Sequence, residues 1–170
     1  AMLEQRNLCG DQSLADALSV KLWSDLFSGS EKEFIEAKLQ EREARHEKQG
    51  GQRYMVEPNV KEGKGGLRDL QSLFWITKYV YRSASTADLV SLNVITPEEH
   101  QIFVKAEAFL WAVRSHLHLI SGRAVETLSF DMQIELADRM GYHDRAGRPA
   151  VEIFMQEYFR QATSVGDLTR

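Results

Sequence analysis

The sequence has one cysteine, Cys9, and three prolines among its 170 residues. A lone cysteine excludes an intrachain disulfide and any metal site built from several thiolates. No apolar run approaches the ~18 residues of a membrane-spanning helix, and the chain does not open with a basic and then apolar signal segment. We therefore expect a cytoplasmic protein that makes no membrane contact.

An excess of basic residues is also missing. The formal net charge is −4, from 21 Lys and Arg against 25 Asp and Glu, whereas nucleic-acid binders usually carry a strong positive charge. Hydrophobic residues make up 43% of the chain and charged residues 27%, which is typical of a folded globular domain. The expectation is one domain of ordinary size without a nucleic-acid partner.

Alternating strand patterns are absent, and apolar residues instead recur at helical spacing. Asp11 is placed to cap a first helix that carries Leu14, Leu18, Leu22 and Leu26 along one stripe. These features favour an all-α protein from the first residues onward.

Further helix starts and stops follow along the chain. Ser30 and Glu33 have the spacing of a capping box, and the charged run 40–49 behind them is typical of a solvated helix face. The strongest start is Thr96 followed by Pro97 and two glutamates. The remaining helices are expected over 67–82, 86–93, 97–121, 131–140 and from about 149 to the end.

The predicted fold class is an all-α helical bundle of five to seven helices with long antiparallel neighbours. We expect residues 1–170 to form a single helical domain that is a fragment of a larger multidomain enzyme. Within it, residues 11–50 supply the N-terminal helices, 51–66 a glycine-rich loop and 67–170 the main bundle.

The segment from Glu57 to Leu70 reads E-P-N-V-K-E-G-K-G-G-L-R-D-L and differs in character from the rest of the chain. Three glycines in four positions are costly to order, and they lead directly into a helix N-terminus, where free N–H groups attract anions. A nucleotide's triphosphate tail is the ligand that this pattern favours. The candidate phosphate-binding residues are Lys61, Gly63, Lys64, Gly65, Gly66 and Arg68, and the candidates for ordering the loop are Glu57, Asn59 and Asp69.

A simpler interpretation of the same segment stays open. Glu57, Glu62 and Asp69 nearly balance the three cations, so the segment can also be a glycine-rich connection with solvated charges. It is not a P-loop, because the G-x-x-x-x-G-K-[ST] spacing is absent.

The same segment resembles the signature of the bifunctional PII uridylyltransferase/uridylyl-removing enzyme family. A related K-x-G-x-G-G-[LI]-R-D stretch occurs in the glutamine-synthetase adenylyltransferase family, but the E-P-N opening and the region around Gly141 and Tyr142 favour the uridylyl enzymes. The resemblance continues through 74–76, 109–111, 114–118, 128–131, 141–142, 158–160 and 165–168.

This resemblance implies a four-part parent, with a nucleotidyltransferase domain, this helical segment, a metal-dependent HD hydrolase domain and paired ACT domains that sense glutamine. The parent would transfer UMP from UTP to a PII signal protein in nitrogen regulation and would also remove it. Mg²⁺ or Mn²⁺ would serve both reactions. The neighbouring nucleotidyltransferase and HD domains and PII would be the partners of the segment.

Catalytic and metal-binding residues are not expected within this segment. The family's metal-holding Asp-x-Asp pair is missing, and His143 and Asp144 lie in a loop between glycines, outside the HD domain. We expect the segment alone to be inactive and to bind no metal. A second hypothesis is a linker or interaction module that docks PII or the catalytic domains through the charged run 40–49 and the Pro97 helix.

Overall fold

The computed structural model describes residues 2–51 and 54–170, and in these residues it is helical with no named strand. The prediction of an all-α fold is therefore confirmed. The elements are η1 (Met2–Glu4), α1 (Gln12–Lys21), the π-helical segment η2 (Leu22–Phe27), α2 (Glu31–Lys48), α3 (Leu67–Tyr81), α4 (Asp88–Ser91), α5 (Pro97–Ser121), α6 (Phe130–Arg139) and α7 (Ala150–Leu168).

Several helices begin and end where the sequence signals predict. The Asp11 carboxylate accepts a hydrogen bond from the Ser13 amide at the start of α1. At α5, the Thr96 hydroxyl accepts from the Glu99 amide at 3.1 Å, and the Glu99 carboxylate accepts from the Thr96 amide at 2.8 Å. Gly122 ends α5 in the left-handed conformation that a glycine adopts without strain.

Two of the predicted starts were wrong in detail. Ser30 stands at the start of α2, but its hydroxyl contacts the Tyr79 hydroxyl at 2.7 Å and makes no cap bond. α4 is shorter than expected, and Asp88 orders its start by accepting the amides of Ala84 and Ser85. At α2, the hydroxyl expected to cap the helix is therefore bound to a distant residue instead.

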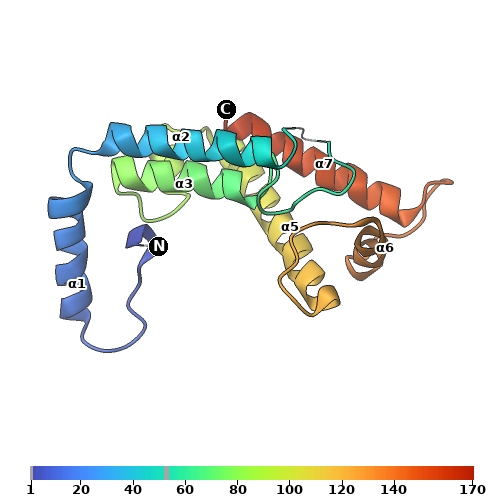
Figure 1. Cartoon of the computed structure of the whole chain (residues 1–170), viewed down its shortest axis with the longest axis horizontal. Coiled ribbons are helices and arrows are strands. Elements are labelled where there is room, and N and C mark those ends of the chain that lie inside the picture. Colours follow the sequence, from blue (N-terminus) through green and yellow to red (C-terminus); the bar gives the residue numbers. More distant parts are fainter. Residues whose placement is uncertain (1, 52–53) are drawn as a thin grey trace.

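The helices form two connected groups. α2 and α3 lie side by side and run in opposite directions, while α5, α6 and α7 pack together at the other end of the molecule (Figure 1). α1 stands away from both groups (Figure 1). No helix within residues 2–51 and 54–170 combines the length and the apolar character that crossing a membrane requires.

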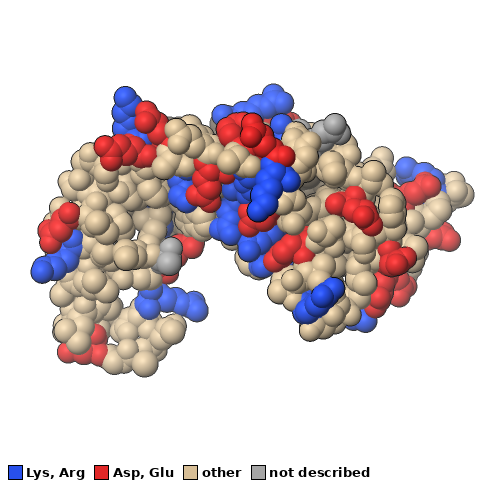
Figure 2. Space-filling model, viewed as in Figure 1, with Lys and Arg blue, Asp and Glu red and all other residues tan. Residues whose placement is uncertain are grey.

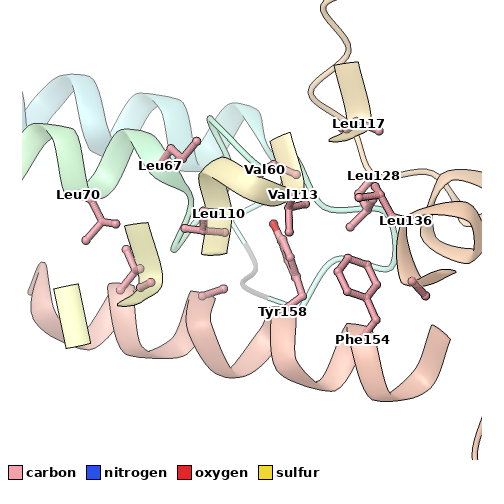
Figure 3. Packing of buried hydrophobic residues seen from close by; sticks show 14 of the residues in the cluster. Val60, Leu67, Leu70, Leu110, Val113, Leu117, Leu128, Leu136, Phe154 and Tyr158 are labelled. Carbon is pink, nitrogen blue, oxygen red and sulfur yellow. The ribbon is translucent and has the colours of Figure 1, made fainter. Parts of the chain in front are cut away.

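The core lies where α5, α6 and α7 meet the start of α3. Leu110, Val113 and Leu117 of α5 are fully buried and face Leu136 of α6 and Phe154 of α7 (Figure 3). Burial of each such side chain contributes about 1.5–3 kcal/mol. Val60, Leu67 and Leu70 join the same cluster, so the core includes residues from both sides of the glycine-rich loop.

Candidate functional site

The glycine-rich loop is built into the fold. The Val60 amide donates to the Glu126 carbonyl at 2.8 Å, and the Leu128 amide donates to the Pro58 carbonyl at 2.9 Å. Asn59 and Thr127 thereby form an isolated antiparallel bridge. Val60 and Leu128 are fully buried, so this pairing fixes the loop against the segment that precedes α6.

The three glycines are required by close backbone contacts within the protein. A Cβ on Gly65 would lie 2.1 Å from the Ala162 carbonyl oxygen of α7, and Gly65 has a φ of +81°. A Cβ on Gly63 would lie 2.5 Å from the Asn59 carbonyl oxygen, and one on Gly66 would lie 2.7 Å from that of Val60. Real Cβ atoms do not approach backbone so closely. The glycines therefore have a packing role that needs no ligand.

Amides at the start of the loop already have acceptors inside the protein. The Asn59 side-chain oxygen accepts from the amides of Lys61 at 3.1 Å and Glu62 at 2.7 Å. The Gly63 amide donates to the Asn59 carbonyl at 2.9 Å, and the Gly66 amide donates to the Gly63 carbonyl at 2.9 Å. Asn59 therefore holds the first turn of the loop through both its side chain and its backbone.

The first amides of α3 are occupied as well. Leu67 donates to the Val60 carbonyl at 3.1 Å, Arg68 to the Lys61 carbonyl at 2.9 Å, and Asp69 to the Gly66 carbonyl at 3.1 Å. A helix start binds anions through N–H groups that lack partners. The loop itself supplies acceptors for these three amides, so phosphate binding at this helix start stays a prediction that the side chains would have to support.

The three predicted cations do not gather at one point. Lys61 Nζ lies 3.7 Å and Arg68 Nη2 lies 3.3 Å from the same Glu62 oxygen. The Arg68 guanidinium also lies over the Trp75 ring, 5.2 Å from its centre. Lys64 is exposed, and within the part of the chain that the structure describes no carboxylate forms an ion pair with it. Lys64 thus differs from the other two cations in having no ion-pair partner among the residues that the structure describes.

Lys64 and Arg68 also face different pockets. Lys64 lines a pocket of about 370 Å³ between α2 and the end of α7, together with Arg42, His46, Glu47 and Arg170. Arg68 lines a separate pocket of about 380 Å³ with Lys38, Trp75 and Tyr79. Lys64 and Arg68 thus line separate pockets.

Asp69 is the centre of the polar network behind the loop. Its carboxylate is 1% exposed and accepts hydrogen bonds from Arg45 Nη2 and from the Gly65 amide at 2.8 Å. His46 Nε2 lies 3.0 Å from both carboxylate oxygens. Burial alone would raise the pKa of Asp69, but the hydrogen bonds from His46 and Gly65 and the charges of His46 and Arg45 hold this pKa below its ordinary value.

Arg45 and His46 are the functional residues that the sequence interpretation missed. The solvated face expected of the run 40–49 is present at residues such as Glu43 and Lys48. Another face of the same helix turns inward, where the Arg45 side chain is only 9% exposed and the His46 side chain 13%. Arg42 belongs to the same inward stripe and donates to the Thr169 carbonyl at the end of α7. Their spacing of three and four residues places them on one helix face, which was the available signal.

A second ion pair stands on the other side of the paired segment. Arg114 of α5 holds Glu126 with two bonds, Nε to Oε2 at 2.9 Å and Nη2 to Oε1 at 2.7 Å. Burial acts to raise the pKa of Glu126, but the Arg114 bond and nearby positive charges lower it overall. Positive and negative side chains accordingly gather together near the middle of the face in Figure 2 rather than forming a purely basic surface.

Glu57, in the first part of the glycine-rich loop, and Asp144 each accept an amide at the start of a helix. The Glu57 carboxylate accepts the Phe130 amide at 3.0 Å, which orders the start of α6. Asp144 accepts the Ala150 amide at 2.8 Å and caps α7. Asp144 therefore has a structural partner, and its neighbour His143 is exposed on the surface.

A metal site is not formed by these side chains. In residues 2–51 and 54–170, no group of three or more His, Cys, Asp or Glu side chains is arranged to hold a metal ion. Asp69 has both oxygens engaged by protein donors, so this buried carboxylate does not fit the ligand set that Mg²⁺ prefers.

Comparisons with known proteins agree with the resemblance in the loop. Residues 33–170 match the family model described as GlnD PII-uridylyltransferase. Over all 170 residues the chain is 65% identical to a bifunctional uridylyltransferase/uridylyl-removing enzyme of Ruegeria pomeroyi and 59% identical to one of Cereibacter sphaeroides. A protein of the same description from Novosphingobium aromaticivorans is 52% identical over 169 residues, 99% of the chain. The chain spans only 19%, 18% and 18% of the lengths of these three relatives.

Proposed function

Because the chain belongs to the GlnD PII-uridylyltransferase family, we propose that the complete protein transfers UMP from UTP to a PII signal protein and also removes it. The complete protein would be a cytoplasmic enzyme of nitrogen regulation. The family match argues against the adenylyltransferase alternative. The proposal concerns the whole polypeptide, since this chain corresponds to about a fifth of its relatives.

The metal ions of the two reactions belong to other parts of the protein in this proposal. Mg²⁺ or Mn²⁺ would neutralise the charge that develops on the transferred phosphoryl group. The described residues supply no cluster for such an ion. This chain would instead provide a rigid helical wall beside the neighbouring nucleotidyltransferase and HD domains.

Lys64 is the residue of this wall that we assign to the nucleotide. The loop beneath Lys64 is fixed by the buried Asp69 and by the Gly65 contact with α7, so the ammonium group extends from a rigid base. Among the described residues, no carboxylate forms an ion pair with this ammonium group. A preorganised cation without a counter-ion is suited to binding a phosphate group. This free charge on a fixed loop is the observation that supports the role.

The experiment is steady-state kinetics of the full-length protein with the Lys64→Ala substitution. Loss of one charge-assisted hydrogen bond weakens binding by about 1.5 kcal/mol, so the KM for UTP should rise roughly tenfold. The rate of UMP removal should stay the same. Arg68→Ala is a poorer probe, because Arg68 also pairs with Glu62 and packs on Trp75.

Lys105→Ala is the matched control, because Lys105 is an exposed lysine on α5 that does not line the Lys64 pocket. It should leave the kinetics of both reactions unchanged. An unaltered KM for UTP in Lys64→Ala, with UMP transfer still measurable, contradicts the nucleotide role of the loop. That result leaves the family membership of the chain intact.

The interaction-module alternative is less well supported than the enzyme proposal. Arg42, Arg45 and His46 are directed toward α3 and α7, so only the remaining charges of α2, such as those of Glu43 and Lys48, are exposed to a partner. PII remains in our proposal as the substrate of the whole enzyme. We do not assign its binding surface to α2.

A further inference from the structure

An apolar groove, called here the α6–α7 groove, lies at the end of the molecule opposite α1 (Figure 1). Its volume is about 350 Å³, and six of its eight lining side chains are hydrophobic. Three of these six are largely open to solvent, with Val56 64%, Phe130 57% and Ile134 63% exposed. Contiguous large apolar side chains that remain exposed mark an interaction site.

The groove has a fixed shape. Met155 and Phe159 of α7 form part of its lining and also pack against the core. Gln133 of α6 donates through its side-chain nitrogen to the Val56 carbonyl at 2.8 Å and to the Leu128 carbonyl at 2.9 Å. Both N–H groups of this amide are therefore used inside the protein, and they tie the segment before the glycine-rich loop to α6. An apolar surface that is already ordered binds a partner at a lower entropic cost.

Carboxylates surround the groove. Asp131 and Glu135 each directly follow an exposed apolar residue of the groove, and Asp138 comes three residues later, so the three form a stripe along α6. Glu152 of α7 lines the groove itself. All four residues are exposed, and only Glu135 forms an ion pair with a described residue, Arg139 at 3.0 Å. Acidic side chains accordingly gather over α6 in the view of Figure 2.

The shape and the charge of the groove indicate which kind of partner fits. Within residues 2–51 and 54–170 there is no named strand whose edge could pair with an extended peptide, whereas a groove between two helices is the usual seat of an amphipathic helix. α6 has 10 residues and is about 15 Å long, which allows contact over about three helical turns. No lysine or arginine among the described residues lines the groove, so its acidic rim attracts a basic polar face and repels an acidic one.

We propose that the α6–α7 groove binds an amphipathic helix of a separate partner protein. The apolar side chains of that helix pack against Phe130, Ile134 and Phe159, and its lysine or arginine side chains lie opposite the carboxylates of α6. The groove shares no lining residue with the Lys64 pocket. The proposal is therefore independent of the nucleotide role assigned to Lys64.

The test is a calorimetric titration of the full-length protein with designed helical peptides. Each peptide has about 18 residues, which is long enough to form a helix, and carries leucine at helical spacing along one face. The first peptide has lysine on its polar face and should bind. The second peptide has glutamate there instead and should bind at least about tenfold more weakly. A third peptide, with serine in place of each leucine and lysine retained, should show no binding.

Matched variants of the full-length protein locate the bound peptide. Ile134→Ser removes an apolar contact of the groove and should weaken binding of the lysine peptide about tenfold. Leu119→Ser makes an equivalent change at a residue of α5 that is 71% exposed and does not line the groove, so it should leave the affinity unchanged. The pair Asp131→Asn and Asp138→Asn should weaken binding and reduce its dependence on salt. This pair tests the same groove if thermal unfolding shows that Ile134→Ser disturbs the fold.

Three results would overturn the proposal. Failure of the lysine peptide to bind the full-length protein means that the groove is already covered there or does not act as a docking site. Equal affinity for the lysine and glutamate peptides, or an affinity unchanged by Ile134→Ser, means that binding does not use this acidic groove. Dimers of the full-length protein that dissociate in Ile134→Ser but persist in Leu119→Ser mean that a second copy of the protein is the occupant.

Discussion

Gly65 is held between two constraints, a left-handed backbone and a carbonyl oxygen of α7. Gly65→Ala adds a Cβ that would lie 2.1 Å from the Ala162 oxygen at a φ of +81°. The strained φ costs about 1–2 kcal/mol, and the clash adds enough to bring the expected loss of unfolding free energy above about 3 kcal/mol. Urea unfolding of the 170-residue chain measures this loss.

Gly122→Ala separates the two constraints. Gly122 has a φ of +64°, and no atom lies within 4 Å of the added Cβ. Only the backbone strain remains, so the expected loss is about 1–2 kcal/mol. Equal losses at Gly65 and Gly122 would mean that the contact with α7 is looser than the structure indicates.

Asp69 makes the unfolding free energy of the chain depend on pH in the acidic range. Its pKa is lowered in the folded protein, so its stabilising effect is complete above the unfolded-state pKa of about 3.9 and is lost as the pH falls through the folded value. The unfolding free energy should therefore decrease below about pH 4. Chemical unfolding between about pH 3 and about pH 7 measures how the unfolding free energy depends on pH.

Asp69→Asn should already be destabilised at neutral pH, by about 3 kcal/mol, because Arg45 loses its buried counter-charge. The variant should also lose less stability than the original chain when the pH is lowered. Asp138→Asn, at an exposed position on α6, serves as the control and should leave neutral-pH stability unchanged. Identical pH profiles for the original chain and Asp69→Asn would exclude Asp69 as the source of the acid sensitivity.

The sequence revealed that the loop was unusual, but it did not reveal why. The glycine spacing was compatible with a phosphate ligand and with a solvated glycine-rich connection, and it did not indicate close packing, which also requires backbone without a Cβ. The decisive neighbours were the Ala162 carbonyl and the Arg45 side chain, which lie far from Gly65 in the sequence. Local patterns do not report such contacts, so the amide acceptors and the partner of Asp69 were not predictable.

At the scale of the element, the start of α5 allows the contribution of one N-cap hydrogen bond to stability to be measured. Thr96→Ala removes the hydroxyl that accepts the Glu99 amide at 3.1 Å, and it should lower the unfolding free energy by about 1 kcal/mol. Ser129 stands at the same position of α6 without a side-chain cap bond. Ser129→Ala should therefore have a much smaller effect in the same urea titration, and equal effects would mean that the Thr96 cap adds nothing.

Helix positions were predictable where the capping signals were local. The Pro97 helix was expected over 97–121 and is observed there, and the helix after the glycine-rich loop begins at Leu67 as expected. Ser30 shows the limit of this approach, because its hydroxyl prefers the distant Tyr79. The local sequence can therefore predict where a helix begins or ends without predicting which hydrogen bonds form there.

At the scale of the whole molecule, stability depends on the cluster between α5, α6 and α7. Leu117→Ala empties a fully buried position and should cost about 2–5 kcal/mol. Leu119, two residues away on α5, is 71% exposed, and Leu119→Ala should stay within about 0.5 kcal/mol of the original chain. Thermal unfolding of the two variants compares the same substitution inside and outside the core, and similar midpoints would contradict the packing described for α5.

The all-α class was predictable from the sequence, whereas the contacts that join separate loops were not. Helical periodicity identified the all-α class, because it is a property of each segment alone. The bridge between Asn59 and Thr127 joins residues from two separate loops, and neither loop carries a strand pattern. This pairing makes the glycine-rich loop part of the core.

The contact between Gly65 and Ala162 has a mechanical consequence. No free space separates the loop backbone from the α7 carbonyl, and packed protein interiors transmit displacement with little compression. Movement of α7 toward the loop should therefore displace the loop backbone, and the Lys64 ammonium group with it. A displacement of α7 toward the glycine-rich loop is therefore expected to be transmitted to the position of the Lys64 side chain.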